Sequence, residues 1–218
     1  ESSRPFSKRI SEREEIKRVI PLLKVLRKKF KKTAISVDTY KYNVAKAATD
    51  EGADIINDIT ALRASTKMAS LIKKYKLGCV LMHMKGKPSN MQVNPKYKDV
   101  MLEELNFFKE RLGYCEKKGI DSSRILIDPG IGFGKRVQDN LRIINELYKL
   151  KVFGLPIFLG LSRKSFIGKI LNVGQKERLV GTVTAGTISI MRGADILRVH
   201  DVARSFQALK ITSKITEN

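Results

Sequence analysis

The segment Ile125-Leu126-Ile127-Asp128-Pro129-Gly130 joins a short apolar run to a carboxylate, a proline and a glycine. A continuous apolar run of this length is typical of a strand that is buried on both faces, as in a parallel sheet. Proline and glycine break the strand and begin a turn. The sequence therefore places the carboxylate of Asp128 at the carboxyl end of a buried strand.

Runs of the same kind recur through the chain and alternate with helical patterns. Short apolar runs predict strands at 34–37, 54–56, 78–82, 125–127, 156–159 and 194–199. Apolar residues at helical spacing predict helices at 11–30, 41–51, 66–75, 99–118, 137–150, 164–171, 177–192 and 202–215. This alternation predicts an α/β fold in which parallel strands are joined by right-handed crossovers.

Polar side chains follow the carboxyl end of each predicted strand, and their distribution distinguishes two α/β architectures. They are Asp38, Asn57, Asp58, His83, Asp128, Ser162, Arg163, Lys164, Arg198, His200 and Asp201. An open doubly wound sheet concentrates such groups at one switch point, whereas a ring of strands brings all of them to one site. We therefore predict a (β/α)8 TIM barrel, one domain over residues 1–218, with about six strands and seven to eight helices in this sequence.

Six strands are two fewer than such a barrel needs. The sequence opens with Glu1-Ser2-Ser3-Arg4-Pro5, a turn-like stretch with no predicted element before it. We therefore expect the domain to be N-terminally incomplete here. The natural polypeptide should carry about 40 to 60 further residues, from two strand–helix units of roughly 30 residues each.

The composition excludes several classes of protein. The chain has 218 residues, 42% of them apolar, so it is neither a disulfide-stapled mini-protein nor a disordered tail. No apolar run approaches the roughly 18 residues of a membrane-spanning helix. Because the stretch Glu1 to Pro5 is polar, we expect no secretory signal. Cys79 and Cys115 indicate neither a disulfide framework nor a zinc site. A cytoplasmic protein with reduced thiols and no membrane association is the simplest interpretation.

The chain is strongly basic, with 43 Lys and Arg against 22 Asp and Glu and a formal net charge of +21. Such a charge attracts anions, either nucleic acid or small phosphates. The lysines are scattered through the predicted helices, and the densest cluster, 27–32, falls at a helix end where cations favour the helix dipole. We therefore expect a lysine-rich surface and no nucleic-acid partner.

Asp38, Asn57 and Asp128 follow different predicted strands and form the first candidate constellation. Two carboxylates and an amide at neighbouring strand ends can read the donor and acceptor edge of a heterocycle. Asp54, Asp58 or Asp38 could instead cap a helix. Capping does not explain why several strands share the feature.

The loop Asp128-Pro129-Gly130-Ile131-Gly132-Phe133-Gly134-Lys135 is rich in glycine. Its spacing matches neither a phosphate loop nor a dinucleotide-binding fingerprint. The glycines would allow a ligand to approach the backbone closely, and Phe133 could present an aromatic face. A flexible connector is the alternative interpretation of the same residues.

Two further motifs carry cations. Ser162-Arg163-Lys164-Ser165 follows a strand and opens a helix, where hydroxyls, cations and free N–H groups suit an anion or a polar substrate edge. Arg198 and His200 lie two residues apart, so their side chains share one face of a strand and suit a diphosphate. His83 has no comparable partner, and we interpret it as structural or rim-lining.

These motifs, in this order and at these spacings, resemble the dihydropteroate synthase family over essentially the whole chain. The matching segments are Ser36-Val37-Asp38-Thr39, Asp54-Ile55-Ile56-Asn57-Asp58, Leu81-Met82-His83-Met84, Asp128 to Lys135, Gly160-Leu161-Ser162-Arg163-Lys164-Ser165 and Arg198-Val199-His200-Asp201. The Ser-Arg-Lys-Ser and Arg-Val-His motifs separate this family from the related pterin-binding methyltransferases. Glu1 to Pro5 resembles the family's Glu-Ser-Thr-Arg-Pro-Gly loop, in which Phe6 here replaces the glycine.

The resemblance implies a transferase of folate biosynthesis that condenses 6-hydroxymethyl-7,8-dihydropterin diphosphate with 4-aminobenzoate. It implies a catalytic set of Lys164, Arg198 and Asp38. The pterin residues would be Asp38, Asn57, Met82, Asp128, Phe133, Gly160, Lys164 and Arg198. The aminobenzoate residues would be Ser3, Pro5, Phe133 and Ser165, and the diphosphate residues Ser3, Arg4, Arg198 and His200.

The resemblance also implies Mg²⁺ on the diphosphate, with the family's metal-binding Asn upstream and no metal ligand in this chain. It further implies a homodimer and a sulfonamide target. The chemistry asks the protein to hold a leaving group, neutralise its charge and orient an amine, without a strong general base. The alternatives are a pterin-dependent methyltransferase that uses methyltetrahydrofolate and a non-catalytic pterin-binding fragment.

Overall fold

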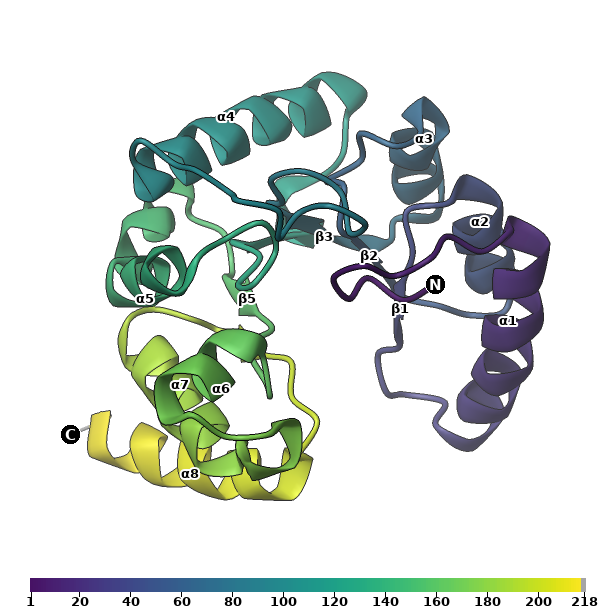
Figure 1. Ribbon diagram of the computed structural model, residues 1–218. Helices are drawn as coiled ribbons and strands as arrows, with labels where there is room; N and C mark the ends of the chain where they lie inside the picture. Colours follow the sequence, from purple (N-terminus) through teal and green to yellow (C-terminus); the bar gives the residue numbers. More distant parts are fainter. Residues whose placement is uncertain (217–218) are drawn as a thin grey trace.

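The computed structural model describes residues 1–216, in which helices lie along an arc outside the strands (Figure 1). The six strands of that range are β1 (Ser36–Asp38), β2 (Ile55–Asp58), β3 (Gly78–Met82), β4 (Ile125–Asp128), β5 (Phe158–Leu159) and β6 (Ile196–Leu197). The eight α-helices of that range are α1 (Glu12–Lys29), α2 (Tyr42–Asp50), α3 (Thr66–Tyr75), α4 (Val100–Lys118), α5 (Val137–Asn145), α6 (Ser165–Leu171), α7 (Leu179–Met191) and α8 (Val202–Thr216). Three short 3₁₀ helices are η1 (Ser122–Arg124), η2 (Leu147–Phe153) and η3 (Gln175–Glu177).

All the strand pairs are parallel. The strands β1 to β4 form one sheet in chain order, β5 pairs with β6, and a parallel bridge between Ile127 and Ile157 connects the two sheets. Since each strand is followed by a helix, the carboxyl ends of the strands come to one edge. The fold is that of the predicted α/β barrel class, and residues 1–216 supply six of its strands.

The core has two main parts, one around β1 to β3 and one around β4 and β5. One packs β1 to β3 against α1, α2 and α3, with Ile56 and Cys79 fully buried. The other packs β4 and β5 against α4 to α7, with Ile127 and Phe108 fully buried. Each fully buried aliphatic side chain contributes about 1.5–3 kcal/mol, so these layers hold the strand ends rigidly in place.

Helix α1 begins as the sequence predicts. The Ser11 side chain accepts a hydrogen bond from the N–H of Glu14 at 3.2 Å, and acidic residues occupy the first turn. An N-cap of this kind satisfies one of the N–H groups left free at a helix start. Among the helices of residues 1–216, none combines the length and the apolar character needed to cross a membrane.

The helix predicted over 137–150 is wrong in its second half. Helix α5 ends at Asn145, and η2 follows it as 3₁₀ helix. In a 3₁₀ helix residues three apart lie on one side, and this conformation buries both Leu147 and Leu150 completely. The apolar residues whose spacing suggested a continuous α-helix are buried by the 3₁₀ helix η2 instead.

The strand predicted over 194–199 is also longer than the one observed. The ladder continues to Arg198, whose N–H bonds to the carbonyl of Leu159 at 2.9 Å. The N–H of His200 instead bonds to the Ser162 side chain at 3.2 Å. A side-chain hydroxyl thus replaces the next carbonyl, and the backbone leaves the sheet before His200.

Candidate active site

A cavity of about 560 Å³ opens where the strands end. It is lined by every residue that the sequence selected for a substrate: Ser3, Arg4, Pro5, Asp38, Asn57, Met82, Asp128, Phe133, Gly160, Lys164, Ser165, Arg198 and His200. Two pairs of them are direct neighbours across the sheet, since Asp38 lies opposite Asn57 and Met82 opposite Asp128. The parallel register therefore brings together side chains that are far apart in the sequence.

Asp38 links β1 to the chain after β6. Its Oδ1 accepts from Nδ2 of Asn57 at 3.1 Å, and its Oδ2 accepts from Nη2 of Arg198 at 2.8 Å. The side chains of Asp38 and Arg198 are 43% and 56% exposed, so their ion pair is weak and can open toward a ligand. Asp38 does not cap α2, which has no side-chain cap, so the capping interpretation fails for this residue.

Asn57 leaves one polar atom unpaired. Its Oδ1 is buried and has no hydrogen-bond partner within the described residues. An unsatisfied buried acceptor costs about 1–3 kcal/mol. Because Asn57 lines the cavity, a ligand N–H would satisfy this oxygen.

Asp128 is 5% exposed at the end of β4, and Oδ1 of its carboxylate accepts from the N–H of Gly130 at 2.7 Å. Burial raises the pKa of Asp128 to about 6, although the Lys164 charge and the Gly130 hydrogen bond act in the opposite direction. The carboxyl is therefore oriented by its own loop and sensitive to its charge partners.

The glycine-rich loop after β4 is not a flexible connector. Gly130 has a φ of +64°, and a Cβ there would lie 2.0 Å from the carbonyl oxygen of His83. Gly134 has a φ of +66°, and a Cβ there would lie 2.1 Å from the carbonyl oxygen of Lys85. Only glycine permits both the conformation and this close approach to the chain after β3.

Lys164 stands immediately before α6 at the cavity wall. Its Nζ donates to the carbonyl of Ile131 and lies 4.5 Å from the centroid of the Phe133 ring. The pKa of Lys164 is lowered to about 8, mainly by burial and also by the positive charges of Lys135 and Arg198, while the charge of Asp128 acts in the opposite direction. Lys164 and Phe133 thus form one continuous piece of wall beside Asp128.

The two cationic motifs are joined to each other. Nε and Nη2 of Arg163 bond to the two carboxylate oxygens of Asp201 at 2.8 and 2.6 Å. Nδ1 of His200 lies 3.0 Å from Oγ of Ser162. The charge of Arg163 is therefore neutralised by Asp201, and among the described residues the cavity keeps Arg4, Lys164, Arg178 and Arg198 as cations that an anion could reach.

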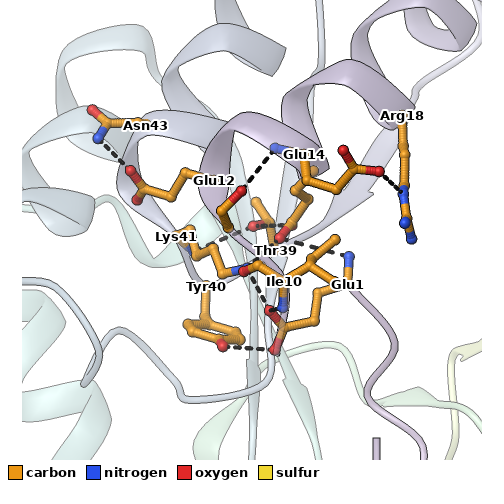
Figure 2. Close-up of polar contacts among 11 residues, drawn as sticks. Glu1, Ile10, Glu12, Glu14, Arg18, Thr39, Tyr40, Lys41 and Asn43 are labelled. Carbon is orange, nitrogen blue, oxygen red and sulfur yellow. Dashed lines mark hydrogen bonds and ion pairs between the residues drawn. The ribbon is translucent and has the colours of Figure 1, made fainter. Parts of the chain in front are cut away.

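The segment 1–10 reaches the cavity through an anchor around Lys41 (Figure 2). Nζ of Lys41 donates to Oε2 of Glu15 at 2.7 Å, to the carbonyl of Ile10 at 2.6 Å and to Glu1. Tyr40 donates to Glu1 at 2.8 Å. Burial works against the charged form of Lys41, but the hydrogen bonds to Glu1 and Glu15 raise its pKa. This anchor brings Ser3, Arg4 and Pro5 to the cavity.

Some functional positions were missed by the sequence reasoning. Lys41 was interpreted only as a helix start and Glu15 only as part of an amphipathic helix, because their partners lie far away in the sequence. Arg178 also lines the cavity and donates to the carbonyl of Arg163 at 3.0 Å. His83 is buried behind the wall, with its Nδ1 2.8 Å from Oε1 of Glu104, which agrees with the structural interpretation.

No group of three or more His, Cys, Asp or Glu side chains within residues 1–216 is arranged to hold a metal ion. The polar groups of the wall are a buried carboxyl, an amide and several cations. Together with the strand order, they define an enzyme of the α/β barrel class whose site takes a small polar heterocycle that carries an anion.

The comparisons with known proteins give the family. The pterin-binding enzyme family matches residues 1–200. The dihydropteroate synthase of Clostridium beijerinckii is 42% identical over 216 residues, which cover 99% of this chain and 77% of that protein. The chain belongs to the dihydropteroate synthase family.

Solved structures of that family agree in fold. The Yersinia pestis dihydropteroate synthase in complex with a sulfonamide drug is 38% identical, with a TM-score of 0.96 over 100% of this chain and 78% of that chain. The Xanthomonas albilineans dihydropteroate synthase with 4-aminobenzoic acid is 39% identical, with a TM-score of 0.93 over 99% of this chain and 77% of that chain.

Proposed function

We propose that this protein condenses 6-hydroxymethyl-7,8-dihydropterin diphosphate with 4-aminobenzoate to give 7,8-dihydropteroate and diphosphate, as a transferase of folate biosynthesis. The observation that carries the proposal is the convergence of Asp128, Asn57, Lys164 and Arg198 on one cavity at the strand ends. The acceptors Asn57 and Asp128 are buried, whereas the cation Arg198 is more than half exposed.

The inner part of the cavity suits a pterin. The carboxylate of Asp128 would accept two hydrogen bonds from the guanidine-like edge of the ring, and the unpaired Oδ1 of Asn57 would accept a third. Lys164 would reach the ring carbonyl, and Arg198 would stack on the ring face. Met82 and Gly160 complete this part of the wall.

The rim suits the leaving group. The carbon–oxygen bond to the diphosphate breaks, the electron pair leaves with the diphosphate, and the ring delocalises the positive charge on the methylene. Arg198, Arg4, His200 and Ser3 would hold the diphosphate, while Asp38 orients Arg198. The amine nitrogen of aminobenzoate then bonds to the methylene, and its proton passes to solvent. Charge neutralisation and orientation account for this chemistry.

The second substrate would lie between the loop after β4 and the segment 1–10. Phe133 and Pro5 supply apolar faces for its ring, and Ser165 and Ser3 supply hydroxyls for its carboxylate. A sulfonamide presents a similar arylamine, so we expect it to compete with aminobenzoate here, in line with the sulfonamide complex of the Yersinia pestis relative.

Four further statements belong to this proposal: Mg²⁺ as a cofactor, a homodimer, a cytoplasmic location and no nucleic-acid partner. The described residues supply no metal-holding cluster, and every role above is therefore assigned to side chains of this chain.

The homodimer is supported by the large apolar side chains that α7 and α8 expose. They are Val180, Ile188, Met191, Val202, Phe206, Ile211 and Ile215.

The test is an assay of the purified chain with pterin diphosphate, aminobenzoate and Mg²⁺, in which mass spectrometry identifies the products. We expect dihydropteroate and diphosphate in equal amounts. Methyl transfer from methyltetrahydrofolate without use of aminobenzoate would instead indicate the methyltransferase. Pterin binding without diphosphate release would indicate a non-catalytic protein.

A further inference from the structure

Three ionisable side chains that the proposed chemistry does not use lie together behind the cavity wall. They are Glu104 of α4, His83 just after β3, and Lys135 at the end of the glycine-rich loop. The side chains of Glu104 and Lys135 are fully buried, and that of His83 is 8% exposed. Burying such charges is costly unless they are paired and hydrogen-bonded.

The nearest polar partner of the Lys135 ammonium is Nδ1 of His83, which lies 2.9 Å from its Nζ. The same Nζ lies 3.2 Å from Oε1 of Glu104 and 3.4 Å from each of the carbonyl oxygens of His83 and Phe133. Nδ1 of His83 lies 2.8 Å from the same Glu104 oxygen. The ammonium donates to Nδ1 of His83 and to the two carbonyl oxygens, while the Glu104 carboxylate, whose oxygens have no hydrogen-bond partner within the described residues, supplies the opposite charge.

This ammonium joins two segments that form the wall. Through the carbonyl of His83 it holds the chain after β3, and through the carbonyl of Phe133 it holds the loop 129–135. The same His83 carbonyl oxygen packs so closely on Gly130 that a Cβ there would lie only 2.0 Å from it. The loop therefore cannot slide along the chain after β3 without breaking the contacts of Lys135.

The cavity residues depend on the position of this loop. Asp128 begins the loop and is oriented by the N–H of Gly130, while Lys164 contacts the Phe133 ring and the carbonyl of Ile131. We propose that Lys135, held by Glu104 and His83, is a positioning residue that fixes the loop 129–135, so that Asp128, Phe133 and Lys164 face the pterin before it binds. This inference rests on the proposed function.

Stability alone does not account for the cluster. Replacing a buried ion pair by apolar residues of similar volume is often neutral or stabilising. An apolar side chain at position 135 could fill the space, but it could not bind two main-chain carbonyls at once. Positioning is therefore the property that separates the cluster from ordinary core packing.

The cluster also acts on the charge of the site. Asp128 is faced by Lys164, Lys135 and Glu104, and Lys135 is faced by Glu104, Asp128 and Asp139. Burial is the largest influence and raises the pKa of Asp128; the charge of Glu104 adds to this rise, and the positive charge of Lys135 opposes it. Pterin affinity should fall at low pH, where Asp128 becomes protonated. Loss of Lys135 alone should therefore move this fall in affinity, the acid limb of pterin binding, to higher pH.

The test compares three forms of the full chain with wild type: the double variant E104L/K135M, the single variant Lys135→Met and the control Cys115→Ala. Cys115 is buried on α4 away from the cluster, so its replacement alters core packing alone. Thermal unfolding reports stability. Calorimetry with 6-hydroxymethyl-7,8-dihydropterin from pH 5 to pH 8 reports binding.

We expect the double variant to unfold near the wild-type temperature and yet to bind the pterin about tenfold to hundredfold more weakly, because the loop has lost its anchor. In Lys135→Met the acid limb of binding should move up by about one pH unit. The control should lose stability without losing affinity. A double variant with wild-type stability, affinity and pH profile would overturn the proposal.

Hydrogen exchange of the wild-type protein without ligand tests whether the loop 129–135 is fixed before the pterin binds, even if the variants do not fold. An anchored loop should protect the amide of Phe133, which bonds to the carbonyl of Gly130 at 2.9 Å. Exchange at the rate of an unstructured peptide would overturn the proposal. These results are independent of the proposed function, which fails separately if wild type does not bind the pterin.

Discussion

Asp128 and Lys164 face each other across the cavity wall, and burial shifts the pKa of each toward its neutral form. Such opposed shifts are typical of functional sites, where a charge is kept available for a ligand. The hydrogen bonds and opposite charges around Asp128 and Lys164 do not offset the effect of burial on their pKa values. A ligand that donates to Asp128 and accepts from Lys164 would supply what is missing.

The first prediction concerns pH. Burial raises the pKa of Asp128 to about 6, so the carboxylate that accepts from the pterin is lost as pH falls through that value. Calorimetric affinity for the pterin should fall by about tenfold per pH unit below about pH 6. Asp128→Asn should bind weakly at every pH, without this acid limb. A flat wild-type affinity between pH 7 and pH 5 would contradict the assignment.

The second prediction concerns Lys164. Lys164→Ala removes the cation between Phe133 and Asp128 and should reduce the rate of dihydropteroate formation by about 100-fold or more. The far-ultraviolet circular dichroism should be unchanged. Lys169→Ala, on the exposed face of the same helix, is the matched control and should keep its rate. Normal turnover in a folded Lys164→Ala would remove Lys164 from the catalytic set.

The third prediction concerns Arg198. Arg198→Ala should weaken binding of the pterin diphosphate much more than binding of aminobenzoate to the preformed complex. Because Arg198 is half exposed, its contribution to affinity should decrease as salt rises. Arg204→Ala, an exposed cation on α8, provides the control. Unchanged calorimetric affinity of Arg198→Ala for the pterin diphosphate would refute this role.

Individual residues were predictable where the local sequence marks them. Asp38, Asn57, Asp128, Lys164 and Arg198 each follow a short apolar run, and this position alone brings them to one edge of a parallel sheet. Lys135 and Glu104 carry no such mark, because their contact joins a loop to the middle of a helix. Buried ion pairs of this kind arise from tertiary packing and leave no periodic pattern in the sequence.

At the scale of elements, the N-terminal segment 1–10 is positioned by one lysine. Lys41 holds it through Glu1, Glu15 and the carbonyl of Ile10, in the arrangement of Figure 2. The segment has no regular secondary structure before α1. Its place at the cavity therefore depends on these side-chain bonds.

The fourth prediction follows from this anchor. Lys41→Met leaves Glu1 and Glu15 without their cation and should lower the free energy of unfolding by about 1–3 kcal/mol. It should also raise the KM for aminobenzoate, since Ser3 and Pro5 move with the segment. Lys46→Met removes an exposed lysine of α2 and should change neither quantity. An unaltered KM in Lys41→Met would separate the anchor from the site.

The elements were predictable in type but less so in length. The predicted helix over 66–75 and the strand over 78–82 have the observed bounds, since strong apolar patterns and clear breaks delimit them. The helix predicted over 137–150 ends early, because 3₁₀ turns bury the same leucines. The strand over 194–199 is shorter, because the Ser162 hydroxyl competes with the backbone for an N–H of the ladder.

At the scale of the whole molecule, the barrel class follows from alternating strands and helices with polar groups at the strand ends. The surface of the molecule also leads us to expect that the protein self-associates. Helices α7 and α8 pack against each other, and each exposes large apolar side chains, which is why we expect two copies to associate.

The fifth prediction is therefore a homodimer through α7 and α8. Phe206, 65% exposed on α8, should lie in the interface, so Phe206→Glu should yield a monomer in analytical ultracentrifugation. Val152→Glu alters an apolar residue of η2 that is even more exposed, at 75%, and should leave the dimer intact. A monomeric wild type would contradict the prediction.

The central claim is that the cavity at the strand ends holds the pterin diphosphate for attack by aminobenzoate. A crystal structure of the protein soaked with 6-hydroxymethylpterin diphosphate tests it most directly. We predict the guanidine-like edge of the ring on Asp128 and Asn57, with the diphosphate on Arg198 and His200. A pterin bound outside this cavity, or inside it with the diphosphate turned toward Asp128, would contradict the account.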